Sequence, residues 1–247
     1  MIERQFTAFR VNEILNHPSV YPWVHGLVDG PLDLTPAIED RRNVLLMGEH
    51  GGIMFHHHGP GLFEAHSQCL PEGRGDWMLT FTHAALHWMF TRTGCVEVIT
   101  RVPKGNLAAR ALTKAAHLTT RLVHPQGWTL AGKIVPAEVF GLTVQDWILT
   151  APALGSGWDG VPSSVQRLLG ALDHTNRRYA VAALDMISGG VPEKGVVFFN
   201  RWAAMTDQPE LSMVSRKPMA FEYGNGLIVF RASGDYYATG SDLQAAS

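Results

Sequence analysis

Residues 62–118 read LFEAHSQCLPEGRGDWMLTFTHAALHWMFTRTGCVEVITRVPKGNLAARALTKAAHL, and this stretch decides the fold. Its apolar residues predict a strand over residues 63–70 and then, after a tight loop, a helix that Asp76 can cap. A β-branched run over residues 95–103 predicts a second strand, and Asn106 can cap a second helix rich in Ala and Leu. The order strand, helix, strand, helix predicts an α/β fold.

The flanking segments extend this unit on both sides. Residues 43–59 predict two strands around a turn at residues 50–52, and the strand over residues 63–70 completes that meander. The first 45 residues are expected to be helical after a short strand at residues 5–10. Two further strands are expected at residues 119–125 and 128–144.

A change of composition predicts where the chain divides. Residues 150–162 are dense in Gly, Pro and Ser, which is typical of a linker. We therefore expect one domain over residues 1–150 and a C-terminal extension of helix and β-hairpin over residues 151–247. In the extension, a helix is expected over residues 163–187, and the Gly-Asn-Gly at 224–226 predicts a hairpin turn. Further strands are expected at residues 195–202, 211–215, 219–223 and 227–232.

The composition argues against several classes of protein. The 247 residues carry a formal net charge of −2 and contain no run of five like charges. A protein that binds the phosphates of a nucleic acid needs clustered Lys and Arg. The start MIERQFTAFRVNEIL carries charges among its apolar residues, whereas a signal peptide needs an unbroken apolar stretch. No segment approaches the roughly 18 apolar residues of a spanning helix. Cys69 and Cys95 fit a reducing compartment better than a disulfide framework. We therefore expect a protein that is not secreted and has neither a nucleic-acid nor a membrane partner.

Arg74 and Gly75 at the first strand-to-helix turn, together with Asn106 and Ala109 in the second helix, resemble the acyl-coenzyme A core of the GNAT (Gcn5-related N-acetyltransferase) superfamily. The resemblance covers residues 5–145 and implies a mixed, splayed sheet with helices on both faces. It also implies that Arg74, Gly75 and Asn106 contact acetyl-coenzyme A, with its pyrophosphate at a helix N-terminus, where free N–H groups attract anions. The alternative is that Asn106 is a plain helix cap and Arg74 a surface charge.

Several positions depart from the family's pattern. Trp77 and Leu79 stand where the family has small residues, and Asp76 places a negative charge where the pyrophosphate would lie. Thr113 replaces a Tyr that in many members is the general acid for the leaving thiolate, and His117 replaces a Gly. The pKa of a Thr hydroxyl lies far above the value of about 10 for Tyr, so Thr113 leaves the acid role unfilled.

The family often draws its general base from the fourth or fifth strand. Glu64 and His66 lie two residues apart and therefore on one face of the predicted fourth strand. In an active enzyme, either side chain could accept the proton of an amine, directly or through water. Glu97 and Thr100 on the next strand are weaker candidates. A half-exposed strand also alternates polar and apolar residues without any catalysis, so the structural interpretation stays open.

Three consecutive histidines raise the question of a metal site. Adjacent strand residues point to opposite faces, so at most His56 and His58 converge, with His66 on the neighbouring strand as a third ligand. Three histidines can hold zinc with an open position. The sequence has no HExxH motif and no zinc-finger spacing, so we expect no metal and a histidine cluster that lines a groove or a partner interface.

His66, residues 70–75 (LPEGRG), residues 88–90 (WMF) and residues 199–203 (FNRWA) resemble bacteriophage-encoded GNAT-like proteins of the head and tail morphogenesis region. This resemblance implies a virion-associated or assembly protein on a GNAT-like scaffold with a degenerate acyl-coenzyme A loop. Its partners would be phage structural proteins or further copies of itself, in the virion or the host cytoplasm. The alternative is an active N-acetyltransferase that uses acetyl-coenzyme A and an amine acceptor. The two hypotheses differ in cofactor binding, because a scaffold protein should ignore coenzyme A.

Overall fold

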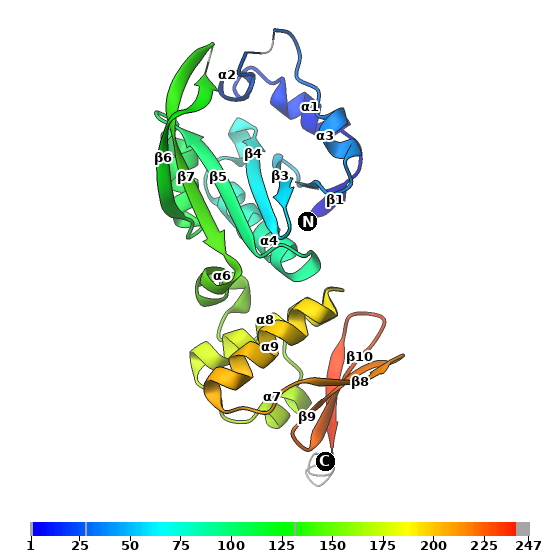
Figure 1. The fold of residues 1–247 in the computed structure, drawn as a ribbon. Helices are drawn as coiled ribbons and strands as arrows, with labels where there is room; N and C mark the ends of the chain where they lie inside the picture. The colour runs from blue at the N-terminus through cyan, green and yellow to red at the C-terminus, as the bar shows by residue number, and fades with distance from the viewer. Residues whose placement is uncertain (1, 28, 131, 241–247) are drawn as a thin grey trace. The chain divides into compact units, whose positions relative to one another are not determined.

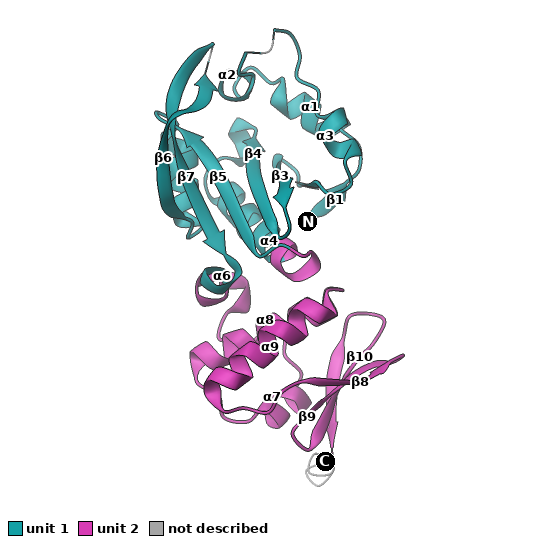
Figure 2. Ribbon diagram, in the orientation of Figure 1, with its two compact units in different colours: residues 1–87, 95–147 teal, residues 88–94, 148–247 magenta. Residues whose placement is uncertain are grey.

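The computed structural model divides into two compact units (Figure 2). The described residues are 2–27, 29–130 and 132–240. The first unit comprises residues 1–87 and 95–147, and the second comprises residues 88–94 and 148–247. Two helices, α4 (Asp76–Arg92) and α6 (Val144–Thr150), therefore begin in the first unit and end in the second. The domain boundary expected at residue 150 stays a prediction.

The first unit is built on a seven-stranded mixed sheet of order β1-β2-β3-β4-β5-β7-β6 (Figure 1). Its strands are β1 (Glu3–Gln5), β2 (Val44–Met47), β3 (Gly51–Gly59), β4 (Leu62–Cys69), β5 (Glu97–Pro103), β6 (Thr119–Leu130) and β7 (Lys133–Thr143). Neighbouring strands pair antiparallel except β4 and β5, which run parallel because α4 carries the chain between them. The expected meander and the three later strands are therefore confirmed.

Helices flank both faces of this sheet. Besides α4, they are α1 (Phe9–Leu15), α2 (Tyr21–Val24), α3 (Thr35–Glu39), α5 (Leu107–Ala115) and the 3₁₀ turn η1 (Pro71–Gly73). On one face, Val11 and Ile14 of α1 pack in a core with Leu45 of β2 and Met54 of β3. Helix α1 therefore covers this face of the sheet. No helix among the described residues is long and apolar enough to cross a membrane.

The opposite face of the sheet packs against α4 and α5. Phe55 of β3 and Val98 of β5 meet Leu86 of α4 and Leu112 of α5 around one small cavity. Because strand residues alternate between faces, Phe55 points to this side while Met54 points to the α1 side. The sheet thus separates two layers of side chains, and the polar residues of β4 divide between them.

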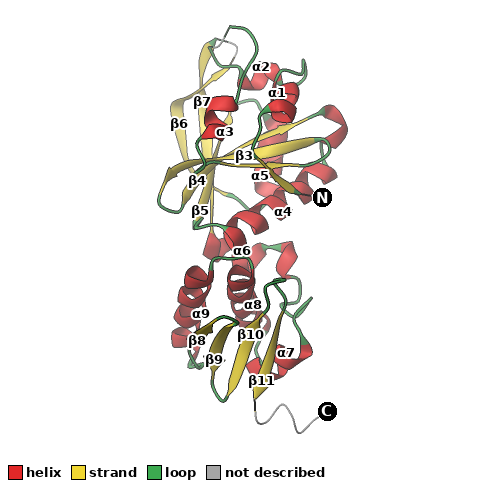
Figure 3. Ribbon diagram, turned by 90° about the vertical axis from the view of Figure 1, so that its right-hand side faces the viewer, coloured by secondary structure: helices red, strands yellow, loops and turns green. Residues whose placement is uncertain are grey.

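The second unit combines helices with a four-stranded antiparallel sheet of order β11-β10-β9-β8 (Figure 3). Its elements are η2 (Pro152–Leu154), α7 (Ser163–Leu169), α8 (His174–Ser188), α9 (Pro192–Thr206), β8 (Ser212–Arg216), β9 (Met219–Tyr223), β10 (Gly226–Phe230) and β11 (Tyr236–Gly240). The buried ring of Phe199 on α9 lies edge-on to both Trp202 and Tyr223. These aromatic contacts pack α9 against β9.

The prediction of a strand at residues 195–202 is wrong, because this segment lies inside α9. The run of Val and Phe favours a strand, but the buried residues Gly195, Phe199, Trp202 and Ala203 follow the spacing of one helix face. Pro192 at the first helical position adds a start signal, since its fixed φ suits a helix N-terminus.

Other boundaries differ more modestly from expectation. The strand expected at residues 5–10 ends at Gln5, and Phe9 already begins α1. The helix expected over residues 163–187 is two helices, separated at Gly170, whose φ of 72° a regular helix excludes. The hairpin turn expected at residues 224–226 joins β9 to β10. Strand β11 was not expected.

Candidate active site

Strands β4 and β5 stop pairing partway along their length. Their parallel register ends at Glu64 beside Ile99. At the next step the Thr100 hydroxyl donates a hydrogen bond to the carbonyl oxygen of Ala65 at 2.8 Å. The Thr100 side chain therefore bridges the two strands where their ladder ends.

A small cavity lies beside this point, on the α4 and α5 side of the sheet. Its volume is about 40 Å³, and its lining includes Phe55, Ala65, Leu86, Thr100 and Thr113. Small-molecule sites usually measure roughly 300–1,000 Å³. The cavity is therefore far smaller than a usual small-molecule site.

The loop that leads into α4 contains Gly75 and ends at a helix N-terminus. Gly75 has a φ of +86°, which favours Gly, and open space surrounds the position of a Cβ there. Asp76 follows as the first residue of α4, a helix of 17 residues whose first N–H groups have no intrahelical acceptor. Arg74 is exposed and donates a hydrogen bond to the carbonyl oxygen of Ser19 at 3.0 Å. The structure thus places Arg74 and Gly75 at the helix N-terminus, as the sequence predicts.

Trp77 packs beside this loop. Its indole stacks on Phe81 at 5.1 Å between ring centroids and meets His50 edge-on at 5.2 Å. Gly48 makes room for this pair, because a Cβ there would lie about 3.0 Å from both rings. The large residue in place of the family's small one is therefore accommodated by a glycine on the neighbouring turn.

The side chains of α5 that the resemblance singles out make local hydrogen bonds. The Asn106 side chain accepts from the N–H of Ala109 at 3.0 Å and so caps the helix. The buried Thr113 hydroxyl donates to the carbonyl oxygen of Arg110 at 2.9 Å. Helix capping therefore explains Asn106 by itself, and Thr113 supplies no acid to the cavity it lines.

A buried carboxylate occupies the other face of β4. Glu64 is 1% exposed, and Arg101 of β5 donates to it twice, from Nε to Oε1 at 2.6 Å and from Nη2 to Oε2 at 2.7 Å. His58 Nε2 lies 2.9 Å from Oε2, and His66 Nε2 lies 3.7 Å from Oε1. The structure therefore brings Glu64 and His66 together, and it adds Arg101 and His58 to them.

The two candidate bases differ in protonation. Burial raises the pKa of Glu64, but the hydrogen bonds of Arg101 and the charges of His66, Arg101 and His58 outweigh it, and the net pKa is lowered. Desolvation lowers the pKa of His66 below 6.5, despite the opposing effect of Glu64. Glu64 is therefore an ionised, weakly basic partner of Arg101. His66 is neutral at pH 7 and can accept a proton.

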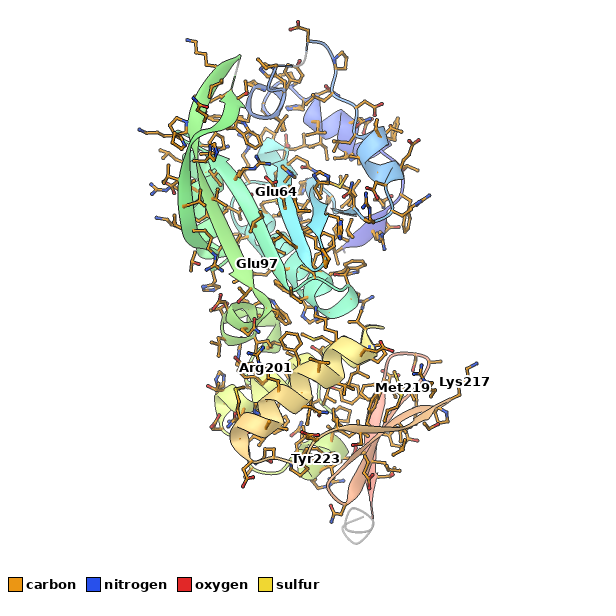
Figure 4. The ribbon with its side chains drawn as sticks, in the orientation of Figure 1. Glu64, Glu97, Arg201, Lys217, Met219 and Tyr223 are labelled. Carbon is orange, nitrogen blue, oxygen red and sulfur yellow. The ribbon has the colours of Figure 1, made fainter. Side chains whose placement is uncertain are left out.

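The remaining candidates lie apart from this group. Glu97 sits on the strand next to Glu64 (Figure 4), where its Oε1 lies 3.4 Å from Arg121 Nη2. His57 points to the opposite face of β3 and meets Phe63 edge-on, whereas the rings of His56 and His58 lie 5.0 Å apart. In the part of the chain that the structure describes, no three His, Cys, Asp or Glu side chains gather as metal ligands.

Sequence reasoning missed Arg101, which lines a second and larger pocket. This open pocket, of about 300 Å³, lies between α2 and β6 and is lined by Val24, Gly26, Arg101, Gln126, Gly127, Trp128 and Thr129. An Arg within a β-branched strand was the available signal, because a charge among apolar residues needs a partner. Its partner on the neighbouring strand could not be read from the sequence.

The fold has counterparts among solved structures. The spermidine N-acetyltransferase from Vibrio cholerae, in complex with CoA and spermine, is 11% identical and superimposes with a TM-score of 0.51 over 60% of this chain and 97% of that chain. The chain has a GNAT-like fold. The structure of yncA, a putative acetyltransferase from Salmonella typhimurium, with its cofactor acetyl-CoA is 16% identical, with a TM-score of 0.49 over 58% of this chain and 93% of that one. No protein-family model and no curated protein matches the sequence.

Proposed function

We propose that the first unit is an acyl-coenzyme A-dependent N-acyltransferase in which His66 is the general base. The observation that carries the proposal is the His66 imidazole, whose Nε2 lies 3.7 Å from a carboxylate oxygen of the buried Glu64–Arg101 pair, where the pairing of β4 and β5 ends. The fold supports it, because a protein of similar fold holds CoA and spermine.

Different residues would have different roles in such a reaction. Arg74, Gly75 and the N-terminus of α4 would hold the pyrophosphate, and the edge of β4 beyond Glu64 would hold the pantetheine. Acyl-coenzyme A supplies the activated acyl group. His66 accepts the proton of the amine as its nitrogen attacks the thioester carbonyl and the carbon–sulfur bond breaks. The thiolate takes its proton from solvent, because the Thr113 hydroxyl is bonded within α5.

The test is release of free thiol from acetyl-coenzyme A in the presence of amine acceptors. His66→Gln should lower the turnover by roughly 10²–10⁴-fold, which is the usual contribution of a general base. His57→Gln is the matched control, because His57 lies on the same sheet but packs on Phe63 on the opposite face. Equal turnover in the His66 variant and the wild type would remove His66 from the mechanism.

A second candidate function is a virion-associated or assembly protein that keeps the scaffold without the chemistry. The cavity of about 40 Å³ and the bonded hydroxyls of Thr100 and Thr113 favour it. Such a protein would bind no coenzyme A and would appear by mass spectrometry in purified particles from the phage-producing host. Turnover that depends on His66 would argue against this candidate.

A further inference from the structure

We propose that the open pocket between α2 and β6 recognises the carboxylate of an amino-acid acceptor through Arg101. The inference deepens the proposed function, on which it rests for the identity of the bound molecule as an acceptor. It names the chemical class of that acceptor, a small zwitterion that carries both an amine and a carboxylate.

The lining of the pocket has one charge. Of the described residues that line its volume of about 300 Å³, Arg101 alone carries a charged side chain, and Gln126 adds an amide. A hydrogen bond joins the two sides of the pocket, because the Trp128 indole N–H of β6 donates to the carbonyl oxygen of Trp23 in α2 at 3.3 Å. The pocket is therefore large enough for a small ligand and positively charged at one point.

Arg101 is held in a fixed orientation. Two of its N–H groups donate to the carboxylate of Glu64, at 2.6 and 2.7 Å. A guanidinium carries five N–H donors, so three remain for a ligand. The Arg101 side chain is 41% exposed, and it lines the pocket. A buried carboxylate thus positions a planar donor group whose outer edge is open, and such a group matches a carboxylate in a two-point hydrogen bond.

The base and the arginine share one atom of Glu64. Arg101 Nε lies 2.6 Å and His66 Nε2 lies 3.7 Å from the same oxygen, Oε1. Arg101 and His66 therefore lie beside the same carboxylate, and in the proposed complex the carboxylate of the amino acid binds Arg101 while its amine lies on the His66 side of Glu64. A polyamine would instead bring positive charge against Arg101, which costs interaction energy at short range. The pocket thus favours an amino acid over a polyamine.

The test uses L-alanine and ethylamine, which differ only in the carboxylate. We would titrate each into the ¹⁵N-labelled full chain without cofactor and follow the indole N–H resonance of Trp128, assigned with Trp128→Phe. L-Alanine should give a saturable shift that ethylamine does not give at the same concentrations. Equal shifts with both ligands, or no shift with L-alanine, would overturn the proposal.

Variants of Arg101 then test whether this side chain binds the carboxylate of L-alanine. Arg101→Lys keeps the charge but loses the planar pair of donors, so the Kd for L-alanine should rise roughly tenfold or more. Arg110→Gln is the control, because Arg110 pairs with Glu138 at 3.0 Å and does not line the pocket. If Arg101→Lys fails to fold, the comparison of the two ligands on the wild type still decides. Unchanged affinity in folded Arg101→Lys would contradict the assignment.

Failure of this proposal can be told from failure of the proposed function. Binding of L-alanine without any binding of acetyl-coenzyme A keeps the carboxylate site and removes the transferase. Turnover of amines that lack a carboxylate, with no response to L-alanine, keeps the transferase and removes the carboxylate site.

Discussion

Glu64 and Arg101 depend on each other, since the carboxylate is 1% exposed and the guanidinium holds both of its oxygens. Removing one partner of a buried pair leaves a charge without compensation. Arg101→Met should therefore lower the free energy of unfolding by about 2–4 kcal/mol, a value reduced because Arg101 is half-exposed.

The double variant Glu64→Gln with Arg101→Met is the matched control, because it removes both charges. Urea unfolding should show that it recovers most of the stability that Arg101→Met loses. A double variant no more stable than Arg101→Met would mean that the ion pair is not the cause.

His66 should make the stability of the protein depend on pH. Its pKa is lowered in the folded state, so the unfolded state binds more protons as the pH falls below 6.5, and the folded state loses stability there. Melting temperatures measured between about pH 7.5 and about pH 5.5 should fall less steeply in His66→Gln than in the wild type. Turnover should rise with pH through the lowered pKa of His66, because only the neutral ring accepts a proton. Identical melting curves across this range for both proteins would contradict the assignment.

At this scale the sequence predicted which side chains share one strand face, while the catalytic role of Glu64 and His66 stays a prediction. The spacing of Glu64 and His66 places them on one strand face, and the structure joins them through one oxygen. Arg101 could not be predicted, because the pairing of β4 with β5 depends on a parallel crossover and not on local pattern. The engagement of Thr113 with its own helix likewise follows from the fold and not from its residue type.

At the scale of elements, α8 and α9 pack closely at a glycine. A Cβ at Gly195 would lie 2.6 Å from the carbonyl oxygen of Ala183 and 2.5 Å from Cγ1 of Ile187. Gly195→Ala should lower the free energy of unfolding by about 1–2 kcal/mol, because overpacking outweighs the gain in helix propensity. Gly94→Ala is the control, since nothing lies within 4 Å of a Cβ there. Equal stability of the two variants in urea would show that the helices can separate at no cost.

Arg178 of α8 holds the segment that enters the second unit. Its guanidinium donates to the carbonyl oxygens of Ile148 at 2.7 Å, Ala151 at 2.7 Å and Gly155 at 2.9 Å. Arg178→Met would leave three carbonyl groups without this donor, so unfolding should become easier by about 3 kcal/mol or more. Arg177→Met on the same helix is the control, because Arg177 is bonded at the surface, to Asp173 O at 3.3 Å. A loss below that of the control would mean that water replaces these bonds.

The elements themselves were predictable where one period dominates. Strands β2 to β5 follow from apolar or β-branched runs between turns, helix α4 from apolar spacing of three and four residues, and helix α5 from its Asn106 cap and its Ala and Leu residues. Helix α9 was not, because Val196, Phe198 and Phe199 have strand propensity and tertiary packing selects the helix.

At the scale of the molecule, the sequence predicted an α/β sheet with flanking helices and a separate C-terminal part. The division of α4 and α6 between two units lay beyond it, because neither helix shows a break in its own sequence. The resemblance of Arg74, Gly75 and Asn106 to the GNAT core predicted this fold, and the similarity to a solved acetyltransferase structure at 11% identity confirms the fold.

The most direct test is a calorimetric titration of the full chain with acetyl-coenzyme A, repeated with Arg74→Ala. We expect saturable heat in the micromolar range that weakens in the variant, because Arg74 lies beside the N-terminus of α4. No heat and no thermal shift at millimolar acetyl-coenzyme A would contradict the transferase and leave the scaffold protein.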